Sequence, residues 1–395
     1  MGTFTKNKLR ITPLQLRKYI YCFFICLSCF LGHFIEMMIN EKVIYVFLFF
    51  AFLLFYIDII NKNIKKRIIY NYYVKIILFV SLLLICSIPF WYSFFNIYSY
   101  LGIFVAVMTH YYTPNEFKKM LLIVLIINLP FIIYEYFYGK YFFIYNREFF
   151  GTAYDGMELY SSLIRTKGLF SGPLTLGIFY LFSILILYKN KIINIIGIIV
   201  AFLANARASF LFSILYYLGI FTINIKSKKN FKSFVRLSIL CVFVIIIILN
   251  TGLITKNATT RIFNAVDFKE ESSNLTRVYY WNNAINMYFS EYSIEYIILG
   301  NNGLFASKFL NNAESGWLSL LLDNGIMGFC FYFFILMKLI YDAIKNKDYI
   351  NLLRLLIMFC CMTIATYHLG RVANLLYWFL IFDIKEAFLI KKMKK

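Results

Sequence analysis

Long apolar runs separated by polar connections constrain this sequence more than any other feature. We count about twelve runs, and most reach the roughly 17 to 25 residues with which an α-helix crosses a bilayer. Hydrophobic residues make up 62% of the 395 residues and charged residues only 15%. A water-soluble fold of this composition would expose large apolar patches and aggregate. The sequence therefore predicts an all-α, polytopic integral membrane protein.

The expected helices form one polytopic membrane domain over residues 1–395. Their expected ranges are 19–39, 43–60, 73–90, 95–112, 120–138, 173–188, 192–204, 208–223, 235–253, 315–341, 349–367 and 372–390.

The net charge of +21 comes from lysines and arginines that cluster in every second connection. In a membrane protein such basic connections face the cytoplasm, so we expect an even number of crossings, with both termini cytoplasmic. The same clustering argues against a nucleic-acid partner. The basic segments are 6–18, 62–67, 118–119, 189–191, 226–236, 345–354 and 391–395.

Two of the outer connections, 139–172 and 254–314, are long, polar and of mixed charge. Loops of this length are usually functional or disordered. Both contain aromatic residues, which disfavours disorder. We therefore expect two large extracytoplasmic loops that fold against the outer face, with short helices at 276–290 and near 303–311.

Arg165 and Lys167 stand shortly before Gly172 and Pro173, which can begin a helix. Cations beside a helix N-terminus suit an anion. A contact with lipid headgroups explains the same pattern equally well.

Arg207 lies in Asn-Ala-Arg-Ala-Ser between apolar runs of 13 and 16 residues. A helix of 13 residues reaches only about 20 Å, short of the roughly 30 Å apolar core. Either the bilayer is thinned here, or Arg207 lies below the outer surface in a protein cavity, where cations usually line a functional path. Its planar fork suits a phosphate. The alternative is a side chain that extends to the headgroups.

Arg277 and Trp281 share a helical face at spacing i, i+4. This spacing fits cation–π packing, or an aromatic shelf for a sugar beside a phosphate-binding arginine. Arg261 lies earlier in the same loop and is a further candidate for substrate contact.

Glu314 ends the second loop at the start of an apolar run. Its carboxylate could be a general base, or a cap or favourable charge at a helix N-terminus. The glycines of Asp323-Asn324-Gly325-Ile-Met-Gly328 would permit a kink or close packing.

Several common catalytic motifs are absent from the sequence. It contains no Asp-x-Asp pair, no Walker A loop and no Gly-x-Ser-x-Gly elbow. The three histidines are scattered, and Cys22, Cys26 and Cys29 extend too far along one helix to close a tetrahedral site. We therefore expect neither a metal nor a nucleotide cofactor.

The order of these features over residues 120–345 resembles the Wzy-type O-antigen and capsule repeat-unit polymerases and the related O-antigen ligases. The matching features are the segment from Arg165 to Pro173, the turn around Arg207, the helix from Arg277 to Trp281, and Glu314 ahead of the Gly325-Ile-Met-Gly328 step. The ligases typically carry a histidine where Glu314 stands, and this departure favours a polymerase.

The resemblance implies a metal-independent membrane glycosyltransferase with a GT-C-like fold in the inner membrane. Its substrates would be oligosaccharide repeat units on polyprenyl pyrophosphate, held within membrane lipid, with a chain-length regulator protein as a further partner. It implies that Arg207 and Arg277 bind the pyrophosphate, assisted by Arg165 and Lys167, and that Glu314 deprotonates or positions the acceptor hydroxyl.

Other classes of protein share parts of this pattern. A flippase for lipid-linked repeat units also suits twelve spans with both ends inside, although the two long loops occupy unrelated positions in the two halves of the chain, unlike many transporters. An O-antigen ligase and a non-catalytic chain-length partner are the remaining alternatives, and a partner of that kind would not need a buried arginine.

Overall fold

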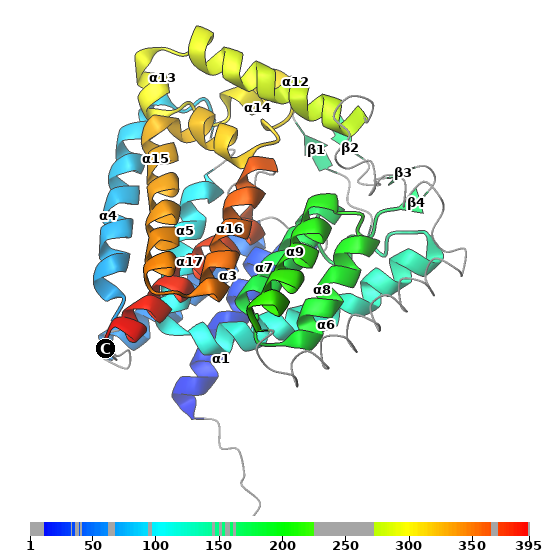
Figure 1. Cartoon of the computed structure of the whole chain (residues 1–395), viewed down its shortest axis with the longest axis vertical. Coiled ribbons are helices and arrows are strands. Elements are labelled where there is room, and N and C mark those ends of the chain that lie inside the picture. Colours follow the sequence, from blue (N-terminus) through cyan, green and yellow to red (C-terminus); the bar gives the residue numbers. More distant parts are fainter. Residues whose placement is uncertain are drawn as a thin grey trace, which may run out of the picture.

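The computed structural model describes residues 12–32, 34–35, 39, 42–61, 68–93, 97–143, 147–149, 152–154, 159–160, 163–224, 272–364 and 370–393. Nearly all of these residues are helical (Figure 1). The first part of the chain forms the helices α1 Pro13–Ile25, α3 Lys42–Ile60, α4 Tyr70–Ser87, α5 Tyr98–Tyr112, α6 Pro114–Tyr138, α7 Pro173–Ile186, α8 Lys191–Leu203 and α9 Arg207–Asn224. The second part forms α12 Ser272–Asn286, α13 Ile294–Leu299, α14 Leu304–Phe309, α15 Gly316–Lys345, α16 Tyr349–Ile364 and α17 Arg371–Met393.

Short helical turns extend three of these helices. They are the π-helix Cys26–Phe30 after α1, the 3-10 turn Ile88–Phe90 after α4, and the π-helix Met287–Glu291 after α12.

Two small β-ribbons occupy the expected first outer loop, where the sequence indicated no strands. In the first ribbon β1 Arg147–Phe149 pairs antiparallel with β2 Thr152–Tyr154. In the second, β3 Leu159–Tyr160 pairs antiparallel with β4 Leu163–Ile164. The described elements are otherwise helical, as the expected all-α class requires.

Four helices in the described part of the chain are long and apolar enough to cross a membrane: Lys42–Ile60, Tyr70–Phe90, Pro114–Tyr138 and Gly316–Lys345. On α3 and α4 large apolar side chains such as Phe49, Leu78 and Ile85 are exposed, which is consistent with a membrane protein whose outer faces contact lipid. A described helix overlaps each expected run except 235–253, which lies outside the described residues. The number of crossings stays a prediction.

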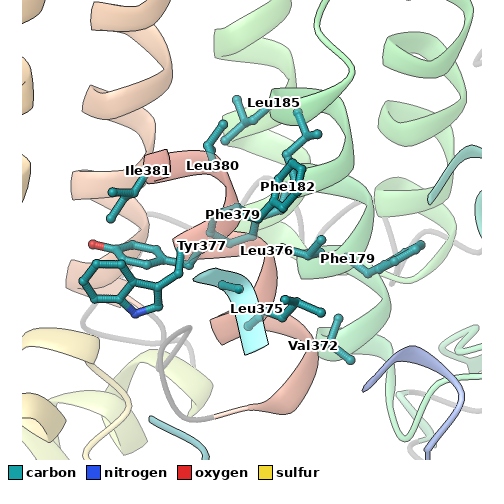
Figure 2. Packing of buried hydrophobic residues seen from close by; sticks show 14 of the residues in the cluster. Phe179, Phe182, Leu185, Val372, Leu375, Leu376, Tyr377, Phe379, Leu380 and Ile381 are labelled. Atoms are coloured by element: carbon teal, nitrogen blue, oxygen red, sulfur yellow. The ribbon is translucent and has the colours of Figure 1, made fainter. Parts of the chain in front are cut away.

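The first half of α17 forms the centre of the bundle. Residues from Leu375 to Phe382 are fully buried, and they pack mainly against α5 and α7 (Figure 2). A helix that is apolar on all sides is expected in the interior. On α5, Gly102 makes the approach possible, because an added Cβ would lie 2.2 Å from Oδ1 of Asn374.

Ion pairs join helices in the segments that the sequence assigns to the inner side. Asp383 of α17 pairs with Arg354 of α16 at 3.1 Å and with Lys118 of α6. Asp58 of α3 pairs with Arg17 of α1 at 2.9 Å. In Figure 1, α1 begins and α17 ends at the lower end of the molecule, whereas α12, α13 and α14 lie at the opposite end.

The upper end is formed by α12, the π-helix after it, α13, α14 and the first part of α15, which we call the cap. It has a hydrophobic cluster of its own, composed of Ala284, Met287, Tyr288, Tyr292, Phe305, Ala313 and Leu322. The hydroxyl of Tyr292 donates to the carbonyl oxygen of Leu322 at 3.3 Å. Burial raises the pKa of Tyr292, so this hydroxyl stays a protonated donor.

The helix α15 breaks at Gly325, where φ is 62° and ψ is −172°. The sequence predicted that glycines in this region would permit a kink. An added Cβ at Gly325 would lie 2.3 Å from the carbonyl oxygen of Ile298, and one at Gly300 would lie 2.4 Å from the backbone of Asp323. The two glycines therefore let α13 lie directly on the break. The part of α15 after Gly325 has about 20 residues, which is about 30 Å and enough to cross a bilayer alone.

Candidate functional site

Arg165 follows the second β-ribbon and is buried. Its Nε donates to the carbonyl oxygen of Ala204 at 3.4 Å, and its Nη2 donates to that of Asn205 at 3.5 Å. These carbonyls belong to the turn between α8 and α9, and Arg207 is the first residue of α9. The structure therefore brings Arg165 beside the turn that leads into Arg207.

The turn before Arg207 has a specific conformation. Asn205 has φ of 49°, in the left-handed region that asparagine tolerates better than most residues. The start of α7 packs against this turn, since an added Cβ at Gly177 would lie 2.4 Å from Cβ of Ala206. Arg207 stands at the positive end of the α9 dipole, where a cation is unfavourable and an anion is favourable. The N-termini of α7 and α9, together with Arg165 and Arg207, thus make the surroundings of the α8–α9 turn electropositive.

Lys167 is almost fully buried. Its Nζ lies 4.6 Å from the centre of the Tyr141 ring, a cation–π geometry. Thr166 beside it is fully buried, and among the described residues its hydroxyl has no hydrogen-bond partner. A buried polar atom of this kind is usually satisfied by water or a ligand.

Two residues of α6 hold the segment 167–169. Oε2 of Glu135 accepts from the backbone N–H groups of Lys167 at 2.7 Å and Gly168 at 2.8 Å. Oδ1 of Asn128 accepts from the N–H of Leu169 at 2.8 Å. Gly168 has φ of 57°, and an added Cβ would lie 2.3 Å from Oδ1 of Asn128. Both the left-handed backbone and the close contact therefore require glycine here.

The sequence reading passed over Asn128 and Glu135. A signal was present, because Glu135 is an ionisable residue within an apolar run, and such residues are usually functional. Asn128 lies seven residues earlier, which is two helical turns and the same face.

Glu314 also has a left-handed backbone, with φ of 54°. Its Oε2 lies 3.7 Å from Nε of Arg277, and its Oε1 accepts from the side-chain amide of Asn311 at 3.2 Å. The N-cap residue of α15 is Ser315, and no side-chain hydrogen bond caps that helix. The geometry therefore favours a carboxylate turned toward Arg277 and Asn311 over a helix cap. The side chains of Arg277 and Glu314 are 23% and 31% exposed, so solutes can reach the pair.

Trp281 lies one turn after Arg277 on α12 and is half-buried. Its indole N–H is buried and has no acceptor among the described residues. Arg277 contacts the carboxylate of Glu314 from the same helix face.

The measured contacts divide the predicted residues into two groups. Arg165, Lys167 and Arg207 lie around the start of α7 and α9, whereas Arg277, Trp281 and Glu314 lie in the cap. Arg261 is outside the described residues. Within the described ranges, no group of three or more His, Cys, Asp or Glu side chains is placed to hold a metal ion.

Comparison with models of known protein families gives no match, and comparison with curated proteins gives none either. Function must therefore be inferred from the residues and their geometry.

Proposed function

We propose that the protein is an oligosaccharide repeat-unit polymerase of the Wzy type. It would join glycans carried on polyprenyl pyrophosphate, for O-antigen or capsular polysaccharide, on the outer face of the inner membrane. This proposal includes about twelve crossings, two extracytoplasmic loops and both termini in the cytoplasm.

The observation that carries the proposal is the meeting of Arg165 with the turn into Arg207. Guanidinium groups bind two phosphate oxygens at once, and the N-termini of α7 and α9 add the favourable ends of two helix dipoles. Lys167 adds a third cation in the same segment. A cationic site of this kind best stabilises a diphosphate leaving group, which gains negative charge as it departs.

In the proposed reaction the acceptor hydroxyl attacks the anomeric carbon of the donor glycan. The new glycosidic C–O bond forms as the C–O bond to the diphosphate breaks, and polyprenyl pyrophosphate leaves with both electrons of that bond. The hydroxyl proton passes to a base. Because the diphosphate already activates the sugar, no nucleotide is consumed.

Glu314 is the proposed base. Arg277 holds one of its oxygens and Asn311 the other, so the carboxylate is oriented before the acceptor arrives. This geometry changes the role of Arg277 from binding the pyrophosphate to orienting the carboxylate. Trp281, one turn further along α12, would pack against a sugar ring.

Surface polysaccharide from a deletion strain, complemented by variants, tests the proposal. Arg207→Ala and Arg165→Ala should abolish the polymer ladder and leave acceptor that carries one repeat unit. Lys308→Ala is the matched control, because Lys308 is an exposed cation of the cap that pairs with Glu291 at 2.6 Å.

The outcome of this complementation distinguishes a polymerase from a flippase and from a ligase. Normal polymer from Arg207→Ala at wild-type protein level would overturn the proposal. A strain with no repeat unit outside the cell would indicate a flippase. A strain with free polymer not joined to its acceptor would indicate an O-antigen ligase.

A further inference from the structure

We infer that Asn128 and Glu135 of α6 are positioning residues for the lipid diphosphate, because they fix the segment that carries Arg165 and Lys167. This inference rests on the proposed function and adds two residues to it. Both side chains are fully buried, and neither needs to touch the substrate.

Glu135 and Asn128 together accept hydrogen bonds from three successive backbone amides. Glu135 binds the N–H groups of Lys167 and Gly168, and Asn128 binds that of Leu169. Gly168, at the centre of this segment, has a left-handed backbone. The three amides are satisfied by side-chain oxygens of α6 instead of by backbone carbonyls.

The strengths of the contacts show which end of the segment is fixed. The bonds to α6 are 2.7 to 2.8 Å long, and two of them involve a carboxylate, which makes them charge-assisted. The bonds from Arg165 to the α8–α9 turn are longer, at 3.4 and 3.5 Å. The backbone of residues 167–169 is therefore held firmly by α6.

In this arrangement the α6 side chains hold the backbone of the segment, whereas the cations of Arg165 and Lys167 are left to bind the diphosphate. Oε2 of Glu135 is shared between two backbone amides, and its Oε1 accepts from the N–H of Phe142 at 3.4 Å. The carboxylate thus holds the backbone at Lys167 and Gly168 firmly. It also makes a weaker contact with Phe142, which follows Tyr141, and the Tyr141 ring lies 4.6 Å from Nζ of Lys167.

Hydrogen exchange of the full chain in detergent tests the positioning directly. In the wild type, amides within 165–170 should exchange slowly. Glu135→Ala should accelerate their exchange at least tenfold, whereas Glu135→Gln, which keeps one acceptor oxygen but loses the charge, should accelerate it less. Glu116→Ala, at the opposite end of the same helix, is the matched control and should leave exchange in 165–170 unchanged.

Binding of purified polyprenyl pyrophosphate to the same samples tests the consequence. Loss of charge-assisted bonds should weaken binding about tenfold or more in Glu135→Ala. Arg165→Ala should weaken it comparably, and the double variant should lose less than the sum of the two single losses, because Glu135→Ala acts in part through the Arg165 guanidinium. A merely structural role would instead give additive losses.

Gly168→Ala provides an independent route if Glu135→Ala fails to fold. It leaves the sequence of α6 unchanged but places a Cβ 2.3 Å from Oδ1 of Asn128, and it should reproduce faster exchange and weaker binding. Unchanged exchange in both Glu135→Ala and Gly168→Ala, or fully additive binding losses, would overturn the inference.

A failure of the proposed function would give a different experimental result from a failure of this inference. Wild-type protein that binds no polyprenyl pyrophosphate, with exchange still controlled by Glu135, would refute the polymerase and the diphosphate while leaving the segment held by α6.

Discussion

The two ends of α6 make their contacts in different ways. Near the N-terminal end Lys118 pairs with Asp383, so one helix side chain binds another. Near the C-terminal end Glu135 binds backbone amides of a loop. The first kind of contact sets where helices lie relative to each other, and the second kind sets the conformation of one segment. We therefore expect changes near the N-terminal end to affect stability and changes near the C-terminal end to affect activity.

Asp383→Ala should have the largest effect on stability. It removes the carboxylate from Lys118 and from the buried Arg354. Breaking a buried pair from one side costs about 3–5 kcal/mol, so the thermal midpoint in detergent should fall strongly while activity per folded molecule is kept. Lys338→Ala, whose side chain is exposed, serves as control. Lost activity with an unchanged midpoint would contradict the division between the two ends.

Gly325→Ala should separate the cap from the bundle. The new Cβ would overlap the carbonyl of Ile298, and a left-handed backbone adds about 1–3 kcal/mol of strain. We expect faster proteolysis of residues 272–315 and loss of polymer.

Gly139→Ala is the control for Gly325→Ala. Gly139 has φ of 61°, but an added Cβ meets nothing within 4 Å. Strain alone should therefore leave the cap intact, and equal cleavage of both variants would show that the close contact with α13 is unimportant.

Glu314→Gln should lower polymerisation at least tenfold, as expected for loss of a general base. The pair with Arg277 is partly exposed, so its loss should cost at most about 1 kcal/mol of stability. Polymerisation rates and thermal midpoints from the same preparation test this, and a normal rate would exclude Glu314 as the base.

Lys308→Ala should have the smallest effect. Its pair with Glu291 is exposed at both partners, with 46% and 48% of the side chains accessible. Such pairs contribute about 0–1 kcal/mol, so midpoint and polymer should match the wild type. A marked loss of polymer would indicate that the surface of the cap takes part in the reaction.

Local pattern was enough to locate most helices. The expected run 372–390 became α17, and the unbroken apolar stretch from Leu375 to Phe382 is the reason its first half lies at the centre. The glycines after Asp323 were expected to permit a kink, and the break occurs at one of them, Gly325. In each case the information lies in neighbouring residues.

The contacts of the candidate site depend on residues far apart in the sequence, which no local pattern reports. Spacing suggested packing of Arg277 with Trp281, and the contact of Arg277 with Glu314, 37 positions away, was not foreseen. Glu135 and Lys167 are likewise joined only by the fold. The β-ribbons were missed because strands of two or three residues leave no period to detect.

The central place of α17 has a consequence for assembly during synthesis. This helix comes after every other described helix, yet α5 and α7 pack against it more than against most of their other neighbours. A nascent chain that has inserted α5 and α7 still lacks the surface that their buried faces require. Chains interrupted before residue 371 should therefore be recognised by membrane proteases, even when all the helices before it have been inserted.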